Sequence, residues 1–218
     1  MRLDFEEVAV SGLTKSYGAT LALAGVNLKF SKGTVTAVLG ANGSGKSTLL
    51  WLLALLGRPT RGEVRFGEHD ARSAAELRAR IGFVAHQLQL YPGLSGQENL
   101  ALAAKLHGLA DGADRAQRLA EQLTMADYWE RPLRTYSRGQ AQRVAIARAL
   151  LHEPRLLLMD EPSTGLDERS TETLIAQIAH QRASGAIVVV VSHELSFAER
   201  IADRVVVIDR GRISEADA

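Results

Sequence analysis

The segment GANGSGKST, from Gly40 to Thr48, has the residue types and spacing of a phosphate-binding loop. Its glycines let backbone N–H groups point at phosphate oxygens, and the helix expected to begin near Lys46 adds the positive end of its dipole. The Lys46 ammonium would bind the β and γ phosphates of a nucleotide, and the Ser47 hydroxyl is a hard oxygen ligand for Mg²⁺. The predicted phosphate-binding residues are Gly40, Ala41, Asn42, Gly43, Ser44, Gly45, Lys46, Ser47 and Thr48.

Two carboxylates, Asp160 and Glu161, follow an apolar segment in RLLLMDEP, and His193 follows a second one in VVVVSHE. If both segments are parallel strands, these side chains meet the phosphate loop at the edge where such sheets bind ligands. Asp160 would hold Mg²⁺ directly or through water. Glu161 would orient and polarise the attacking water, and His193 would lie beside the γ-phosphate. The predicted catalytic residues are therefore Glu161, His193 and Lys46.

The elements that must position these residues can be predicted from hydrophobic periodicity. Strands are predicted at residues 26–30, 34–40, 155–160, 186–192 and 204–211. Helices are predicted at residues 46–56, 97–107, 114–123, 137–152, 168–183 and 194–201. Strands that alternate with helices predict an α/β fold with a parallel sheet and crossover helices. Between about residues 87 and 134, three apolar-periodic segments follow one another without a strand, which predicts an inserted helical subdomain.

Composition excludes several classes of partner. The chain has 218 residues, with 26 Lys and Arg against 25 Asp and Glu, so no net field favours nucleic acid. It has no cysteine, which fits a reducing compartment. The longest uncharged apolar run, residues 49–56, is far shorter than the ~20 residues that span a bilayer. The acidic start, MRLDFEE, lacks the pattern of a secretory signal, so we expect a cytoplasmic chain.

The segments TYSRGQAQRVAIARALLHEP, LLLMDEPSTGLD and VVVSHE together resemble the nucleotide-binding domain of ATP-binding cassette (ABC) transporters. Ser137, Gly139 and Gln140 match the family signature Leu-Ser-Gly-Gly-Gln, whereas Tyr136 and Arg138 depart from it at the first and third positions. Ser137 also has the residue type of a helix N-cap. The signature is expected to lie far from the Lys46 loop of its own chain. The resemblance implies head-to-tail dimers in which one subunit's signature covers the ATP bound to the other.

Further positions carry over from the same resemblance. Tyr17, in KSYG, looks like the aromatic residue that stacks on adenine. The segment STGLD, which ends at Asp167, resembles the loop that communicates between the two sites of the dimer. Aligning IGFVAH, and counting back from Pro92, both put His86 where the family has a glutamine that contacts Mg²⁺ and water. Imidazole is a poor ligand for Mg²⁺, so either His86 acts through water or Gln87 takes this place.

The resemblance implies a phosphate-loop NTPase core with a mostly parallel sheet, an N-terminal antiparallel β subdomain and the helical subdomain. One ATPase domain would cover residues 1–218, with residues 1–86 and 135–218 in the core and about 87–134 in the helical subdomain. The implied cofactors are ATP and Mg²⁺. The implied partners are a second ATPase subunit and integral membrane subunits. The helical subdomain would bind a short helix of the membrane subunits, which places the chain at the inner face of the membrane.

The sequence constrains the transported substrate less than it constrains the fold. The His-Gln pair and the Ser-Arg-Gly core of the signature resemble the ATPase subunit of the haem exporter in cytochrome c maturation. ATPases of multidrug or polysaccharide exporters, and non-transport relatives that act on ribosomes or DNA, remain alternatives. A small-molecule kinase would leave the signature and His193 unexplained.

Overall fold

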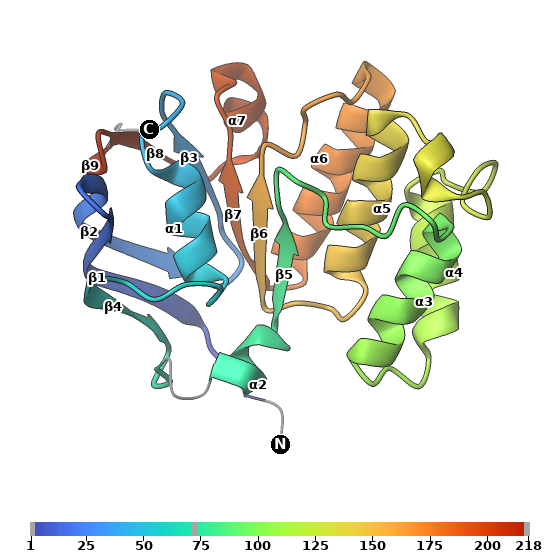
Figure 1. Ribbon diagram of the computed structural model, residues 1–218, viewed down its shortest axis with the longest axis horizontal. Coiled ribbons are helices and arrows are strands. Elements are labelled where there is room, and N and C mark those ends of the chain that lie inside the picture. Colours follow the sequence, from blue (N-terminus) through green and yellow to red (C-terminus); the bar gives the residue numbers. More distant parts are fainter. Residues whose placement is uncertain (1–2, 71–73, 216–218) are drawn as a thin grey trace.

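The computed structural model describes residues 3–70 and 74–215. Its strands form a three-stranded sheet and a six-stranded sheet that lie on opposite sides of helix α1 (Lys46–Leu53), as Figure 1 shows. The remaining long helices lie on the far side of the six-stranded sheet. The predicted α/β class, with its antiparallel and helical additions, is confirmed.

The six-stranded sheet carries the predicted catalytic and phosphate-binding residues. In spatial order its strands are β5 (Ile81–Val84), β6 (Leu156–Asp160), β7 (Ile187–Val191), β3 (Val35–Leu39), β8 (Arg204–Asp209) and β9 (Arg212–Glu215). The first five are parallel, and β9 pairs antiparallel with β8. Every residue of β6 and β7 is buried, which explains why both read as continuous apolar runs. The predicted strands that end at Asp160 and before His193 are therefore neighbouring interior strands of the sheet.

The three-stranded sheet is antiparallel, in the order β2 (Thr20–Ser31), β1 (Glu7–Tyr17) and β4 (Arg61–Phe66). The predicted strand at residues 26–30 is only the second half of β2. β1 and β4 were not predicted individually. The pairing of β1 with both neighbours shifts register around Ser11 to Thr14, so its alternation of apolar and polar residues is broken there.

Helix α1 fills the space between the two sheets. Leu49, Leu50, Leu52 and Leu53 are buried in one core with residues of β1, β2 and one face of the six-stranded sheet. The prediction that this helix extends to residue 56 is wrong. Leu55 takes a left-handed φ of 56°, and Gly57 and Pro59 follow, so the chain turns away from the helix axis.

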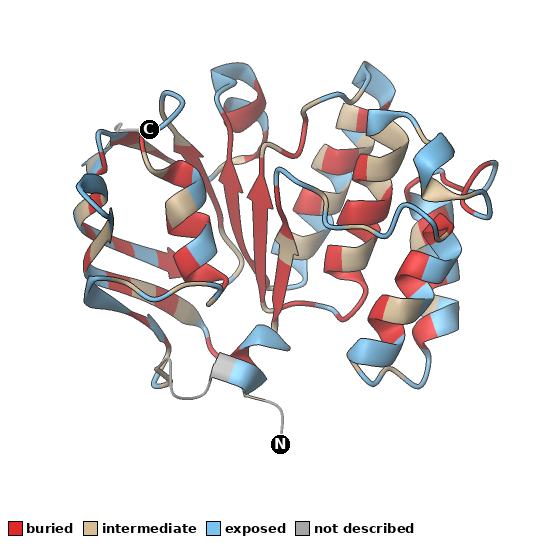
Figure 2. Cartoon of the chain, viewed as in Figure 1, coloured by how far each residue is buried: buried red, intermediate tan, exposed pale blue. Residues whose placement is uncertain are grey.

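A second core lies on the other face of the six-stranded sheet. It is covered by α5 (Arg138–Leu150), α6 (Glu168–Ala183) and α7 (Leu195–Ile201). Figure 2 shows the central strands buried on both faces and these helices exposed on their outer sides. Predicted and observed bounds agree for α6 and differ by one or two residues for α5 and α7.

The predicted helical block between about residues 87 and 134 contains two α-helices, α3 (Gly96–Leu106) and α4 (Gly112–Gln122). A 3₁₀ turn at Leu133–Thr135 lies at its end. A short helix, α2 (Ala74–Arg78), and the short strands β5 and β9 were not predicted. Within residues 3–70 and 74–215, none of the helices combines the length and apolarity that a bilayer span requires.

Candidate functional site

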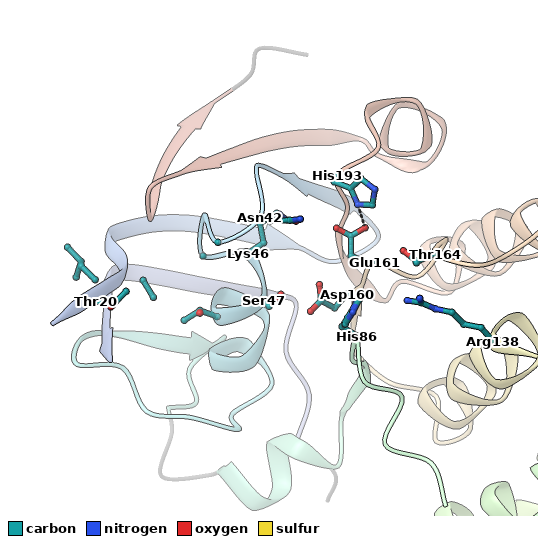
Figure 3. Close-up of a pocket in the computed structure, with 15 residues that line it drawn as sticks. Thr20, Asn42, Lys46, Ser47, His86, Arg138, Asp160, Glu161, Thr164 and His193 are labelled. Atoms are coloured by element: carbon teal, nitrogen blue, oxygen red, sulfur yellow. Dashed lines mark hydrogen bonds and ion pairs between the residues drawn. The ribbon is translucent and has the colours of Figure 1, made fainter. Parts of the chain in front are cut away.

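A cavity of about 730 Å³ lies where β3, β6 and β7 end; we call it the main cavity. It lies at the carboxyl edge of the parallel strands, the position expected for ligands in such sheets. Figure 3 shows its side chains converging from the Lys46 loop, from the ends of β5, β6 and β7 and from the start of α5. The lining residues are Thr20, Leu21, Ala22, Asn42, Gly43, Gly45, Lys46, Ser47, Thr48, His86, Arg138, Asp160, Glu161, Thr164 and His193.

The phosphate loop connects β3 to α1, as predicted. Gly40 and Gly45 have φ values of 152° and 112°, and a Cβ at either position would collide with a backbone carbonyl, that of Ile208 or Ala22. Glycine is therefore required at both positions. The Lys46 side chain is 6% exposed, and its ammonium donates hydrogen bonds to the carbonyls of Gly40 at 2.6 Å and Ala41 at 3.0 Å. The loop thus holds the positive charge of Lys46 against its own backbone carbonyls.

Only part of the rest of the loop lines the cavity. Asn42, Gly43, Ser47 and Thr48 line the cavity, whereas Gly40, Ala41 and Ser44 do not. The Ser44 hydroxyl is buried and has no hydrogen-bond partner among the described residues. Its backbone carbonyl accepts a hydrogen bond from the Gly211 N–H at 2.9 Å, so the turn between β8 and β9 supports the loop from behind.

Two oxygen ligands suitable for Mg²⁺ lie in the main cavity. Ser47 comes from the first turn of α1, and the buried carboxylate of Asp160 comes from the last residue of β6. Within the described ranges, no group of three or more His, Cys, Asp or Glu residues could hold a metal ion. This donor set fits Mg²⁺, which commonly binds through one or two protein ligands together with phosphate oxygens and water.

Glu161 and His193 form a pair above the phosphate loop. The His193 Nδ1 lies 2.7 Å from Glu161 Oε2, and Figure 3 shows the two side chains pointing at each other. The Glu161 side chain is only 12% exposed, and its backbone N–H donates to the Val191 carbonyl, which ties the ends of β6 and β7 together. With a left-handed φ of 52°, Glu161 turns its carboxylate into the cavity instead of continuing the strand.

The two candidates that follow β5 are placed differently. His86 lines the main cavity, and Figure 3 shows its ring beside Asp160. Gln87 is exposed and does not belong to the lining. His86, which aligns with the glutamine of the family, is thus the one of the two residues whose side chain lines the cavity.

The signature segment begins α5. Ser137 is its N-cap, as predicted, and forms a capping box in which the Gln140 N–H donates to Ser137 Oγ and the Ser137 N–H donates to Gln140 Oε1. Ser137, Gly139 and Gln140 lie outside the lining of the main cavity. Arg138, which sequence comparison marked only as a departure from the signature, lines that cavity. The signal that could have found it is an added positive charge at a position where the family has glycine.

Two other predicted residues lie outside the main cavity. Tyr17 is 47% exposed, with the Lys15 ammonium 5.0 Å from its ring centre, although nearby Thr20, Leu21 and Ala22 line the cavity. Asp167 is the N-cap of α6 and accepts a hydrogen bond from the Ser170 N–H at 2.8 Å. Hydrogen bonds from Ser170 hold the pKa of the Asp167 carboxyl below its usual value. Thr20, Leu21, Ala22 and Thr164 were not predicted from the sequence because they match no phosphate-binding motif.

β3, the glycine-rich loop and α1 place Lys46 in the same cavity as Asp160 and Glu161. This arrangement defines the phosphate-loop class of nucleotide-binding proteins. Within that class, a family model described as "ABC transporter" matches residues 23–164. The chain therefore belongs to the ABC transporter family, which confirms the predicted family and its ATPase class.

Individual relatives support the same assignment. The daunorubicin resistance ATP-binding protein DrrA3 of Streptomyces coeruleorubidus is 37% identical over 209 residues, which cover 94% of this chain and 66% of the relative. The methionine import ATP-binding protein MetN of Rhizobium etli is 37% identical over 218 residues, covering 96% of this chain and 60% of the relative. The chain thus spans about two thirds or less of the length of these curated relatives.

Solved structures agree with the fold. An ATP-binding cassette described as a dimer in a post-hydrolysis state with ADP and Pi has a TM-score of 0.87 and 29% identity. That likeness covers 97% of this chain and 99% of the solved one. A second structure, an ATP-binding subunit of an ABC transporter, also has a TM-score of 0.87, with 30% identity over 96% of this chain and 90% of its own.

Proposed function

We propose that this chain binds ATP together with Mg²⁺ in the main cavity and hydrolyses the bond to the γ-phosphate. The observation that carries the proposal is the convergence of the Lys46 loop and the Glu161–His193 pair on one cavity. Lys46 would exchange its two carbonyl partners for the β and γ phosphates. Ser47 and Asp160 would hold Mg²⁺, whose charge offsets that of the phosphates.

In this proposal Glu161 orients the attacking water. Its carboxylate is shielded from solvent, and a hydrogen bond to His193 fixes one of its oxygens. The other oxygen has no hydrogen bond within the described part of the chain and could accept one from a water at the γ-phosphate. Because phosphoryl transfer has a loose transition state, the work of these residues is positioning and charge stabilisation. His86 reaches Mg²⁺ or the attacking water only through a further water.

The second half of the catalytic arrangement comes from another copy. Ser137, Gly139 and Gln140 begin a helix whose N-terminus suits an anion, yet they lie outside their own chain's cavity. A head-to-tail dimer would bring them over the γ-phosphate bound to the partner. Tyr17 would stack on adenine, and the loop ending at Asp167 would pass between the two sites.

The substitution Glu161→Gln tests this proposal. The amide keeps the size and one acceptor but lacks the negative charge that orients water, so turnover should fall by about a hundredfold or more while ATP still binds. The variant should then accumulate as an ATP-bound dimer in size-exclusion chromatography. Glu199→Gln, on an exposed carboxylate of α7, is the matched control and should hydrolyse ATP normally. Normal turnover by Glu161→Gln would show that the assigned role of Glu161 is wrong.

A separate groove supports the proposed membrane partner. It encloses about 270 Å³ between the helical segment and the sheet, and combines the exposed Leu56 and Leu106 with Arg78, Arg148 and His107. Its described lining residues include no carboxylate. Burial lowers the pKa of Arg148, whose guanidinium donates to the Gln89 carbonyl. An amphipathic helix with leucine-like and acidic side chains, presented by an integral membrane subunit, would complement this groove.

We further propose that the chain powers export, with haem as the candidate substrate. The His86-Gln87 pair and the Ser-Arg-Gly signature support this proposal. The test is ATP-dependent accumulation of haem in inverted vesicles that hold the chain with its membrane subunits. Vesicles that carry Glu161→Gln provide the control. If normal vesicles hydrolyse ATP but take up a drug or polysaccharide precursor and not haem, the substrate proposal is wrong and the ATPase proposal stands.

A further inference from the structure

Arg138 extends from the first turn of α5 into the main cavity. Figure 3 shows its guanidinium pointing toward Thr164 and Asp160, on the side opposite the Lys46 loop. Among the described residues it has no hydrogen bond or ion pair, although two carboxylates, Asp160 and Glu161, line the same cavity. An arginine that faces a cavity without a protein partner has its five donors available to a ligand.

The stem of Arg138 is held by the neighbouring loop. Gly165, in STGLD, has a φ of 79°, and a Cβ placed on it would lie 3.0 Å from the Arg138 Cδ. The methylene groups of the arginine therefore cross the loop at Gly165, where the loop has no side chain. A larger residue at 165 would push the stem away, so the glycine gives the guanidinium its direction into the cavity.

The charges of the cavity suggest what Arg138 binds. Lys46 and Arg138 approach from opposite walls, and the proposed ATP would lie in the main cavity between them. The β phosphate and the γ phosphate both lie within reach of the Lys46 loop in such an arrangement. With adenine at Tyr17, beside the lining residues Thr20 to Ala22, the terminal phosphate is the one that would extend toward the opposite wall.

We propose that Arg138 contacts the γ-phosphate of the ATP bound to its own chain, and so makes the single subunit prefer ATP to ADP. The proposal rests on the proposed ATPase function and adds a contact within one subunit to a signature segment whose other residues serve a partner. Arginine suits this contact because its planar fork binds two phosphate oxygens together. The step is binding alone, without transfer of a group.

The test compares affinities for ATP and ADP in the monomer. Arg138→Met keeps most of the stem that packs on Gly165 but removes the charge. Nucleotide affinity is measured by titration with Mg²⁺, at concentrations where sedimentation velocity finds single chains. ATP affinity should fall about fivefold, while ADP affinity changes less than twofold. Arg138→Lys should recover part of the loss, and Arg134→Met, on an exposed arginine outside the cavity, should change neither affinity.

The outcomes separate this proposal from the general one. If the unaltered chain binds ATP but Arg138→Met binds both nucleotides as the unaltered chain does, the proposed contact does not exist. If monomer affinity is unchanged and only ATP-induced dimerisation weakens, Arg138 acts on the partner's nucleotide and the contact within one chain is wrong. Equal losses for ATP and ADP would likewise overturn it, since the contact is to the γ-phosphate. Failure of the unaltered chain to bind ATP would instead overturn the proposed function.

Discussion

The two sides of the main cavity are built differently. On the sheet side, Lys46 and Asp160 are each 6% exposed, and the residues that carry them pack against buried strands. On the helix side, Ser137 and Arg138 are exposed at the start of α5, and no strand fixes them. The sheet side is complete within one chain, whereas the helix side offers donors to groups that the chain does not itself contain. Burial thus distinguishes the half whose polar groups are fixed by the sheet from the half whose polar groups stay exposed.

The largest expected effect lies on the sheet side. Lys46→Ala removes a charge-assisted contact to the β and γ phosphates worth about 1.5 to 3 kcal/mol, so ATP affinity should fall roughly 10- to 150-fold. Isothermal titration calorimetry with Mg²⁺ and ATP measures it. Lys105→Ala, in α3, is the control and should bind ATP normally. Unchanged ATP affinity in Lys46→Ala would show that Lys46 does not contact the phosphates.

A pair of capping serines sharpens the comparison. Ser95 and Ser137 form the same capping box, but Ser95 is buried at α3 while Ser137 is exposed. Ser137→Ala should lower dimer-dependent ATP turnover about tenfold, because it removes a hydroxyl offered to the partner's phosphate.

Ser95→Ala should instead lower the free energy of unfolding by about 1 kcal/mol and leave turnover of the folded protein unchanged. Steady-state ATPase assays and urea denaturation measure the two effects. If both serines affect turnover alike, exposure is not what distinguishes a functional cap from a structural one.

A smaller effect is expected at the end of β5. His86→Ala should slow basal hydrolysis several-fold, roughly 1 kcal/mol in the barrier, because His86 lines the cavity. Gln87→Ala should change basal hydrolysis less than twofold and should alter stimulation by the membrane subunits more. Single-turnover assays with and without those subunits measure both. The opposite ranking of the two variants in basal hydrolysis would make Gln87 the functional residue.

The smallest effect concerns the charge on Asp167. Its pKa is lowered in the fold, so the ionised carboxylate stabilises the native state above the usual pKa of aspartate, about 4, and this contribution disappears as the pH falls through the lowered value. Asp167→Asn keeps a good N-cap without the charge. Its melting temperature should be slightly below that of the unaltered chain at pH 7, and the two should converge under acid conditions. A constant gap from pH 7 to pH 3 would mean that the charge plays no part.

Sequence alone predicts the sheet side of the cavity better than the helix side. The strand, loop and helix around Lys46 follow from local rules, because glycine spacing and apolar runs encode them directly. The end of α1 was misjudged, since the apolar residues up to Leu56 continue the pattern while Leu55 turns the backbone. Periodicity reports which residues are apolar, not where the chain bends.

Arg138 shows why the remainder could not be predicted. Its position in the cavity depends on α5 packing beside the STGLD loop, where a Cβ on Gly139 would lie 2.9 Å from the Gly165 carbonyl. No local pattern near Arg138 encodes that packing. The short elements β5 and α2 are similar cases, because each has too few residues to establish a period.

The place of β3 in the sheet has a consequence for how the protein is made. β3 lies between β7 and β8, two strands that come about 150 residues later in the chain, and the Ser44 carbonyl accepts its hydrogen bond from Gly211. On the ribosome the chain emerges from its N-terminus, so the residues of the phosphate loop appear long before the strands that flank and support them. The loop can therefore take its final shape only after β7, β8 and Gly211 have been synthesised. A nascent chain would remain without nucleotide until then, and ATP would stabilise only chains in which these strands have joined the sheet.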